Sequence, residues 1–220
     1  MAGRRFGRGL APAVVQAWRD FSTAFNEFPF GGGLYSTPRQ FGPSNLLWGE
    51  PTGYPAGPVG FPYDDLESWR TPYPPEVFIG QLEKVAEGFE TAVDSLRQAP
   101  VSMRLTGAMY EAFTRELAVA ETTAIHFRSS ANQARFVWTR NRLRAAVSAA
   151  EARSLIAELE QLLRREIDAA RRMYTLQMTD SRLGFEASNQ YYYVPLDLVE
   201  KILNCRHLLD RWLPAERRKW

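Results

Sequence analysis

The sequence has few of the residues that supply covalent and metal chemistry. Among its 220 residues Cys205 is the single cysteine, so no internal disulfide can form. Its apolar neighbours Leu203 and Leu208 predict a buried thiol rather than a reactive one. The two histidines, His126 and His207, are too few for a His-rich metal site. We therefore expect neither a bound metal nor a cofactor.

Net charge and long apolar runs are also scarce. A net charge of +2 gives no nucleic-acid signature, and the arginines at 135–144 fit the basic end of a helix. No apolar run approaches the roughly 18 residues of a membrane span. The N-terminal apolar residues are interrupted by Gln16, Arg19 and Asp20, which is unlike a signal peptide. We expect no nucleic-acid or membrane partner, and a cytoplasmic protein by default, although the sequence leaves the compartment open.

The dominant pattern is helical, because apolar side chains recur three or four positions apart in five segments. Each expected helix opens at a residue that favours a helix N-terminus: Pro12, Pro75, Ser102, Ser148 and Pro195. The last helix is expected to end at Pro214, because proline interrupts a helix. Long helices joined by short turns predict an all-α, antiparallel bundle of about five helices.

The helix faces are also predicted. The first helix carries a face of aromatic residues: Trp18, Phe21, Phe25 and Phe28. The fourth helix is expected to bury a face ending at Tyr174, with the ion pairs Glu160–Arg164 and Asp168–Arg172 on its wet side.

One long segment breaks the helical pattern. Residues 28–75 contain 18 of the 29 Gly and Pro residues, which excludes a long helix there. The segment is also rich in aromatics, and disordered segments are poor in them. We expect an ordered irregular loop packed on the bundle, or an arm that packs against a further domain. The chain then divides into an N-terminal helix (1–27), this loop (28–75) and a helical bundle (76–220), within one domain.

The two non-helical segments collect aromatic, acidic and amide side chains. This is the chemistry of a sugar site, where rings stack on a sugar face and carboxylates and amides bond its hydroxyls. The candidate ligand-binding residues are Trp48, Glu50, Tyr63, Asp64, Asp65, Trp69, Arg70, Asp180, Arg182, Glu186, Asn189 and Tyr191. The same side chains could instead fasten the loops to the bundle.

No catalytic motif is present, so we assign no catalytic residue. A glycoside hydrolase would need two carboxyl groups facing one cleft, and Asp64 or Asp65 with Glu186 is the candidate pair for that possibility.

The stretch 180–206, with 17–22, 42–45 and 61–70, resembles the C-terminal helical region of large bacterial glycoside-hydrolase-like proteins. These are related to α-glucuronidases and hexosaminidases, and a TIM barrel precedes their helices. The chain is too short for the roughly 250 residues of such a barrel. The resemblance therefore implies a C-terminal or accessory portion of a larger carbohydrate-active protein, not catalytic alone, with a saccharide or a missing barrel domain as partner. The alternative is a structural or protein-interaction bundle with an exposed aromatic surface.

Overall fold

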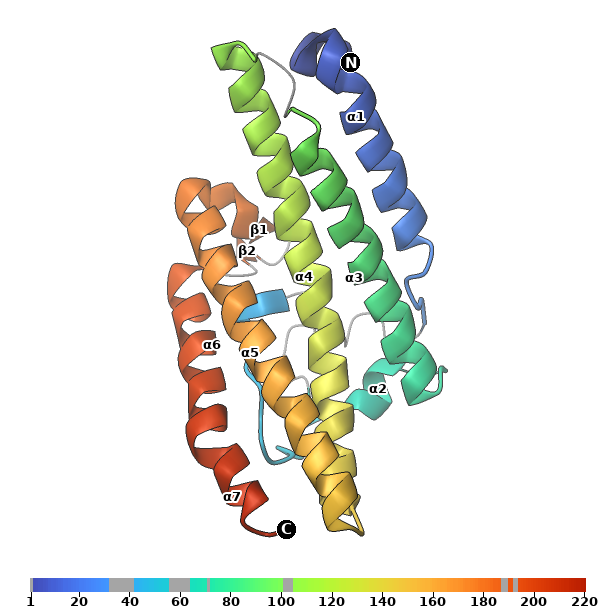
Figure 1. The fold of residues 1–220 in the computed structure, drawn as a ribbon, viewed down its shortest axis with the longest axis vertical. Helices are drawn as coiled ribbons and strands as arrows, with labels where there is room; N and C mark the ends of the chain where they lie inside the picture. Colours follow the sequence, from blue (N-terminus) through green and yellow to red (C-terminus); the bar gives the residue numbers. More distant parts are fainter. Residues whose placement is uncertain are drawn as a thin grey trace.

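A computed structural model describes residues 2–31, 42–55, 64–70, 72–100, 105–186, 190, 191 and 194–220, and for residues 69, 185, 186, 190 and 191 the backbone alone. The fold is an all-α bundle, as predicted. Five elements run antiparallel in sequence order, so that each packs mainly on the next (Figure 1). They are α1 (Ala2–Phe25), α3 (Pro75–Gln98), α4 (Gly107–Ala145), α5 (Ala149–Thr179) and α6 (Pro195–His207).

Shorter elements complete the described chain. These are η3 (Gly42–Ser44), α2 (Leu66–Arg70), η4 (Ser181–Gly184), the paired strands β1 (Phe185–Glu186) and β2 (Gln190–Tyr191), η5 (Leu208–Trp212) and α7 (Leu213–Arg217). Both α2 and η3 fall within the segment that the sequence predicts to be irregular.

Helix α1 begins ten residues before Pro12, so the predicted start is wrong. Phe6 and Leu10 are each 1% exposed, and the burial of these side chains favours helix in this part of the chain. Gly7 forms a kink at φ 73°, and a Cβ there would lie 2.6 Å from the Sδ atom of Met109. Glycine therefore allows α1 to bend close over the start of α4.

The partner of the aromatic face of α1 lies within the bundle. Phe21 stacks on Phe89 of α3 at a centroid distance of 4.8 Å, and Phe25 and Phe28 contact Phe127 of α4. Part of the face remains accessible, because Trp18 and Phe25 are 39% and 38% exposed.

The next boundaries are partly confirmed. Helix α3 opens at Pro75, and Ser148 caps α5 by accepting a hydrogen bond from the backbone N–H of Glu151 at 3.2 Å. The N-cap of α4 is Thr106 rather than Ser102, which lies outside the described residues.

The wet face of α5 is also partly confirmed. Glu160 pairs with Arg164 at 2.7 Å as predicted. Arg172 pairs with Glu121 of α4 instead of Asp168, and Tyr174 is 37% exposed instead of buried. These last two predictions are wrong because α5 leaves α4 at this end, so its side chains there meet solvent and the flank of α4.

The helical rod that begins with α6 continues past Pro214. It begins at Pro195 as predicted, then passes through the π-turn η5 into α7. Proline 214 has no N–H to donate to the preceding turn, and the N–H of Leu213 bonds the carbonyl oxygen of Leu208 five residues earlier. The wider turn lets the helix continue past the proline, so the predicted end is wrong.

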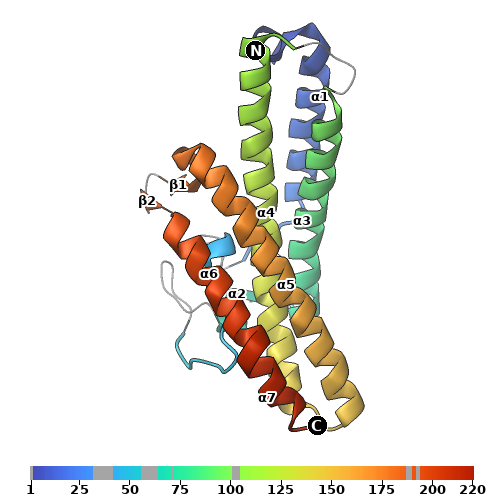
Figure 2. The ribbon, with the colours of Figure 1, turned by 60° about the vertical axis from the view of Figure 1, so that its left-hand side comes forward.

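The helices are shifted relative to one another along the axis of α4. Helices α5 and α6 sit towards the C-terminal end of α4, whereas α1 and α3 cover its N-terminal end (Figure 1). Figure 2 shows α5 crossing α4 and diverging from it towards the C-terminal end of α5. Where the two helices diverge, a groove opens between the N-terminal half of α4 and the end of α5.

Candidate functional site

The first candidate site is a short segment held between α4, α5 and α6. Residues 45–48, named the strap here, follow η3, and Asn45 and Leu47 are 0% and 1% exposed. Helix side chains bond successive backbone groups of the strap. Asn204 donates to the carbonyl oxygen of Leu47 and accepts from its N–H, each at 2.9 Å. Because these bonds satisfy backbone groups that water cannot reach, the strap is part of the folded core.

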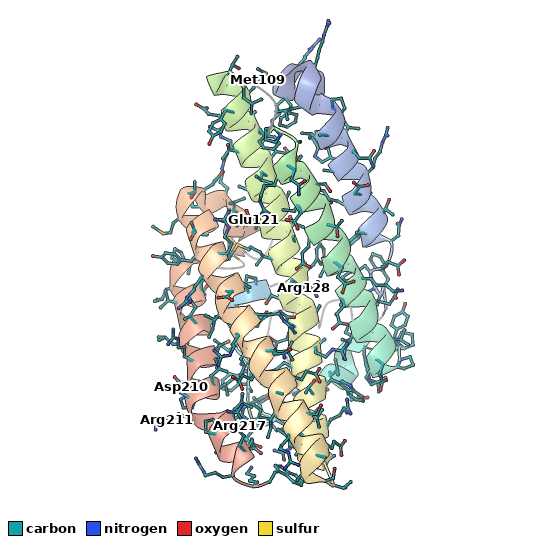
Figure 3. The ribbon with its side chains drawn as sticks, viewed as in Figure 1. Met109, Glu121, Arg128, Asp210, Arg211 and Arg217 are labelled. Atoms are coloured by element: carbon teal, nitrogen blue, oxygen red, sulfur yellow. The ribbon has the colours of Figure 1, made fainter. Side chains whose placement is uncertain are left out.

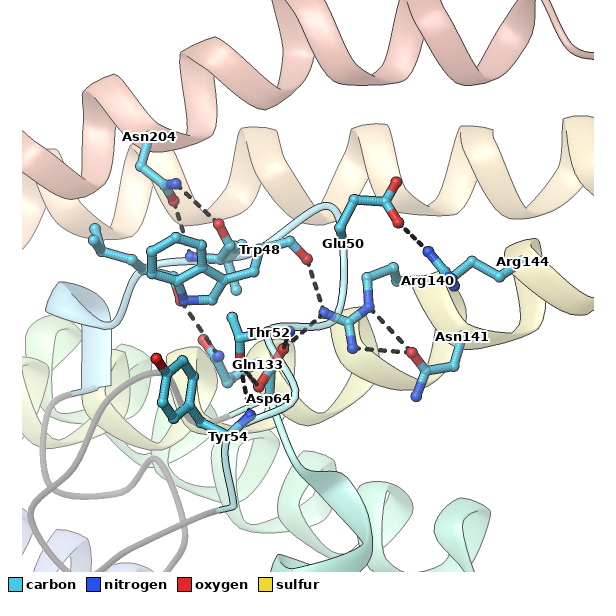
Figure 4. A network of polar contacts seen from close by, with 12 residues as sticks. Trp48, Glu50, Thr52, Tyr54, Asp64, Gln133, Arg140, Asn141, Arg144 and Asn204 are labelled. Carbon is cyan, nitrogen blue, oxygen red and sulfur yellow. Dashed lines mark hydrogen bonds and ion pairs between the residues drawn. The ribbon is translucent and has the colours of Figure 1, made fainter.

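The other strap carbonyls are bonded in the same way. Lys201 donates to the carbonyl oxygen of Asn45, Gln133 to that of Leu46 at 3.5 Å, and Arg140 to that of Trp48 at 2.9 Å. Figure 4 shows these contacts around Trp48, Arg140 and Asn204.

A buried ion pair lies under the strap. Lys201 Nζ is 2.9 Å from Glu166 Oε2, and both side chains are 0% exposed. Glu166 also accepts hydrogen bonds from Ser129 and Asn132, each at 2.7 Å. With three donors on one carboxylate, the charge of Glu166 is well compensated, and the cluster joins α4, α5 and α6.

Sequence reasoning missed this cluster, although a signal for it exists. Glu166 continues the apolar stripe Leu155, Leu159 and Leu162 of α5, and Lys201 stands between the buried Leu198 and Cys205 of α6. A charge on an otherwise apolar stripe indicates a buried pair.

The same burial sets the chemistry of Cys205. Desolvation raises the pKa of its thiol to about 12, against an opposing effect of Lys201. The predicted burial of the thiol is confirmed, and its low reactivity stays a prediction.

Asp64 is the centre of a second polar group. Its Oδ1 accepts from the Thr52 hydroxyl and its Oδ2 from the Thr52 N–H, each at 2.7 Å. Oδ2 lies 3.3 Å from Arg140 Nη1, and the two side chains are 3% and 1% exposed. Burial lowers the pKa of Arg140, and the Asp64 carboxylate opposes that shift. The pair therefore anchors the loop to α4.

The remaining described candidates in the loop differ in their surroundings. Trp48 is 37% exposed, and Glu50 pairs with Arg144 of α4. Asp65 accepts from the Ser68 hydroxyl at 2.5 Å, beside the start of α2.

Arg70 bonds Glu67 and donates to the carbonyl oxygen of Tyr73 at 2.7 Å. Trp69 lies in α2 by its backbone, and Tyr63 lies outside the described residues.

The candidates near residue 180 lie elsewhere. Arg182 forks onto Asp180 with distances of 2.8 and 2.6 Å, and this hydrogen bonding lowers the pKa of Asp180 to about 2. The backbones of Glu186 and Tyr191 belong to the β1–β2 pair, and Asn189 lies outside the described residues. Asp64 and Asp65 line one hollow, whereas Asp180 and Arg182 line another. The candidate residues of the loop and those near residue 180 therefore lie in two separate hollows and do not form one shared site.

The second hollow is a groove of about 680 Å³ between α4 and α5. Its apolar lining comes from both helices and from η4: Tyr110, Leu117, Ala118, Leu176 and Leu183. Three acidic and three basic side chains also line it, among them the hydrogen-bonded pair Arg172–Glu121.

A further groove of about 800 Å³ continues along α4, between α3 and α5, and the two meet at Glu121. Its lining contains six acidic and three basic side chains. Four of the acids form a stripe on α3: Glu83, Glu87, Glu90 and Asp94. Arg128 of α4, labelled with Glu121 in Figure 3, donates to Glu90 at 2.6 and 2.8 Å.

Together the two grooves form one elongated depression, named the trough here. One face of α4 is its floor, with residues three or four positions apart: Tyr110, Thr114, Leu117, Glu121, Ile125, Arg128 and Asn132. At 1.5 Å per residue this floor is about 33 Å long. The part from Tyr110 to Glu121 is the apolar section, and the part from Glu121 to Asn132 is the acidic section.

None of the described helices is long and apolar enough to cross a membrane. In the described part of the chain, no three His, Cys, Asp or Glu side chains are grouped so that they could hold a metal ion.

No protein-family model, no curated protein and no solved structure matches the chain. The resemblance to the helical region of glycoside-hydrolase-like proteins therefore stays a prediction.

Proposed function

We propose that this chain is a protein-interaction module that binds an amphipathic helix in the trough. The trough itself is the observation that carries the proposal. Amphipathic helices bind other proteins by laying an apolar face into a groove of this kind. A floor of about 33 Å accommodates roughly 20 helical residues.

The construction of the trough supports a docking role. Ion pairs join its walls to its floor, with Arg128 bonded to Glu90 of α3 and Arg172 bonded to Glu121 of α4. Buried contacts under the strap fix α4, α5 and α6 relative to one another. A floor and walls held in this way are preformed, which lowers the entropic cost of binding a helix.

Tyr110 is the most accessible apolar residue of the lining, at 60% exposure. With the half-buried Leu117 it gives a guest helix two apolar contacts about two turns apart along α4.

A selection experiment tests the proposal. Displayed peptides of about 20 residues are selected against the wild-type chain and counter-selected against a trough variant, Thr114→Arg with Thr175→Arg. Both threonines are exposed and line the apolar section, so the substitutions fill the trough without disturbing the core. Val147→Asp is the matched control, because Val147 is 92% exposed in the α4–α5 turn.

The selected peptides are expected to share an apolar i, i+4, i+7 pattern. Their affinity for the trough variant should fall at least about tenfold, a loss of about 1.4 kcal/mol, while Val147→Asp binds as the wild type does. Equal binding to all three chains, or selection of sequences without helical periodicity, would contradict the proposal.

The saccharide hypothesis remains a second candidate because of the hollow beside Asp64. Tyr54, 69% exposed, lines this hollow of about 360 Å³ together with Asp64 and Asp65. A ring next to carboxylates is the chemistry that sugars require. A glycan array followed by calorimetry tests it. Binding that Tyr54→Ala removes would support this candidate, and absence of any saccharide binding would refute it.

A further inference from the structure

The outer face of α6 has a stripe of exposed apolar residues. Leu196, Val199 and Leu203 are 73%, 38% and 65% exposed. Their spacing of three and four places them on one side of the helix. A contiguous apolar stripe on a helix is the usual signature of a face that packs on another helix.

Beyond this stripe the same helical rod becomes basic. From residue 206 onwards its exposed basic side chains are Arg206, Arg211, Arg217, Arg218 and Lys219, and its exposed acidic side chain is Asp210. The π-turn η5 keeps this part of the chain helical. Arg217 pairs with Glu160 of α5 and Lys219 with Glu216, whereas Arg206, Arg211 and Arg218 have no ion-pair partner within 4 Å among the described residues. Figure 3 shows Asp210, Arg211 and Arg217 at this end of the molecule. The face therefore reads apolar first and basic second.

The trough has the matching order along α4. Its apolar section comes first and its acidic section second, with six acidic against three basic side chains in the latter. Among the described residues, two acidic side chains of this lining, Glu87 and Asp168, have no ion-pair partner within 4 Å. One basic side chain of the lining, Arg165, also has no such partner. A basic segment over this section gains favourable Coulomb energy that an acidic or neutral segment lacks.

The two surfaces also match in length. The helical rod from Leu196 to Arg217 rises about 32 Å, against about 33 Å for the trough floor from Tyr110 to Asn132. We propose that the trough binds the α6–α7 face of a second copy of this chain, with α6 parallel to α4. This inference rests on the proposed helix-binding function and names its occupant.

The two surfaces belong to different sides of one molecule. Helix α6 stands at one edge of the bundle in Figure 1, where α5 lies between it and the helices α4 and α3. A chain can therefore use its trough for one neighbour and its α6–α7 face for another. Such a head-to-tail contact between unlike surfaces does not close on itself in a pair, so it builds longer chains as concentration rises.

Mixing two blocked variants tests this arrangement by sedimentation. The trough variant is Thr114→Arg with Thr175→Arg, and the face variant is Leu196→Asp with Leu203→Asp. All four positions are exposed, so each variant keeps its fold, which circular dichroism verifies. Val147→Asp again serves as the control.

The wild type and the control should exceed the 25.1 kDa of one chain increasingly with concentration. Each blocked variant alone should remain at one chain. Their equimolar mixture should form a complex of two chains that grows no further, because each member supplies the surface that the other lacks. Raising the salt from about 0.05 M to 0.5 M should weaken the wild-type association, since the contact includes opposite charges.

Three results would each overturn the inference. The first is a wild type that stays at the mass of one chain up to the highest concentration reached. The second is a mixture of blocked variants that does not associate, and the third is a blocked variant that associates alone. The peptide selection tests the proposed function independently of this inference. If the chain is monomeric but still selects helices that bind the trough, the helix-binding function stands and only the second copy as its occupant is refuted.

Discussion

Replacement of Lys201 by methionine tests the role of the buried cluster under the strap. Methionine keeps most of the length of the lysine stem and removes its charge, so no large cavity forms. Glu166, 0% exposed, would then keep the donors Ser129 and Asn132 and lose its balancing charge. The carbonyl oxygen of Asn45 would also lose its lysine donor.

Removing one member of a buried ion pair costs about 3–5 kcal/mol, and one lost hydrogen bond about 1 kcal/mol. Because two donors remain on Glu166, we expect Lys201→Met to lower the free energy of unfolding by about 3–4 kcal/mol.

A double variant isolates the charge from the packing. In Lys201→Met with Glu166→Gln no unpaired charge remains, and the glutamine oxygen can still accept from Ser129 or Asn132. Replacing both members of a buried pair by neutral groups is often close to neutral, so the double variant should lose less than about 2 kcal/mol. Urea unfolding followed by circular dichroism measures all three chains. A Lys201→Met loss below about 1 kcal/mol, or a double variant less stable than the single one, would refute the anchoring role.

Three further predictions follow from local geometry. Gly88→Ala should destabilise the chain by about 1–3 kcal/mol, because its Cβ would lie 2.5 Å from the Cβ of Ala24 in α1. Gly80→Ala, in the same helix with open space around it, should stabilise the chain by about 0.5–1 kcal/mol. A melting temperature of Gly88→Ala equal to or above that of Gly80→Ala would contradict the α1–α3 contact. The Asp180 carboxyl should titrate near pH 2 in an NMR titration, so its small stabilising contribution is present above about pH 4 and is lost as the pH falls to 2. In Arg182→Gln the Asp180 pKa should rise towards about 3.9, because the guanidinium donors are lost while the N–H of residue 182 remains, and an unchanged value would exclude the ion pair as the cause. The Cys205 thiol should not react with a thiol reagent at pH 8 in the folded chain and should react in urea, whereas labelling of the folded chain would contradict its burial.

The fold class and several helix boundaries could be predicted from local signals. Pro75, Pro195 and the Ser148 cap act within one turn of the chain, so the sequence contains all the information that they need. The start of α1 and the end of α6 depend on tertiary contacts. Burial of Phe6 outweighs the breakers Gly7 and Pro12. At the other end the π-turn keeps the helical rod continuous before Pro214, and the leucines at its two ends, Leu208 and Leu213, are 5% and 1% exposed.

The candidate sites were harder to predict, for a physical reason. The backbone of the strap pairs with Lys201 and Asn204, which are more than 150 residues away in sequence. Helix α4 buries polar side chains such as Ser129, Gln133 and Arg140, so its sequence lacks a simple apolar stripe. The trough depends on the angle at which α5 leaves α4, and a sequence pattern does not fix such an angle. Acidic and aromatic composition drew attention to Asp64 and Asp180, whose carboxylates have partners within the chain.

The central claim is that a helix binds along α4 between α3 and α5. The most direct measurement is a methyl NMR titration of the leucine-labelled face variant with a peptide obtained from the selection. In this variant the α6–α7 face of one copy cannot compete with the peptide for the trough of another copy. Shifts should concentrate on Leu117, Leu176 and Leu183, which line the apolar section. Shifts centred on Leu143 or Leu213, which belong to the core of α4, α5 and α7, with the trough leucines unchanged, would contradict the claim.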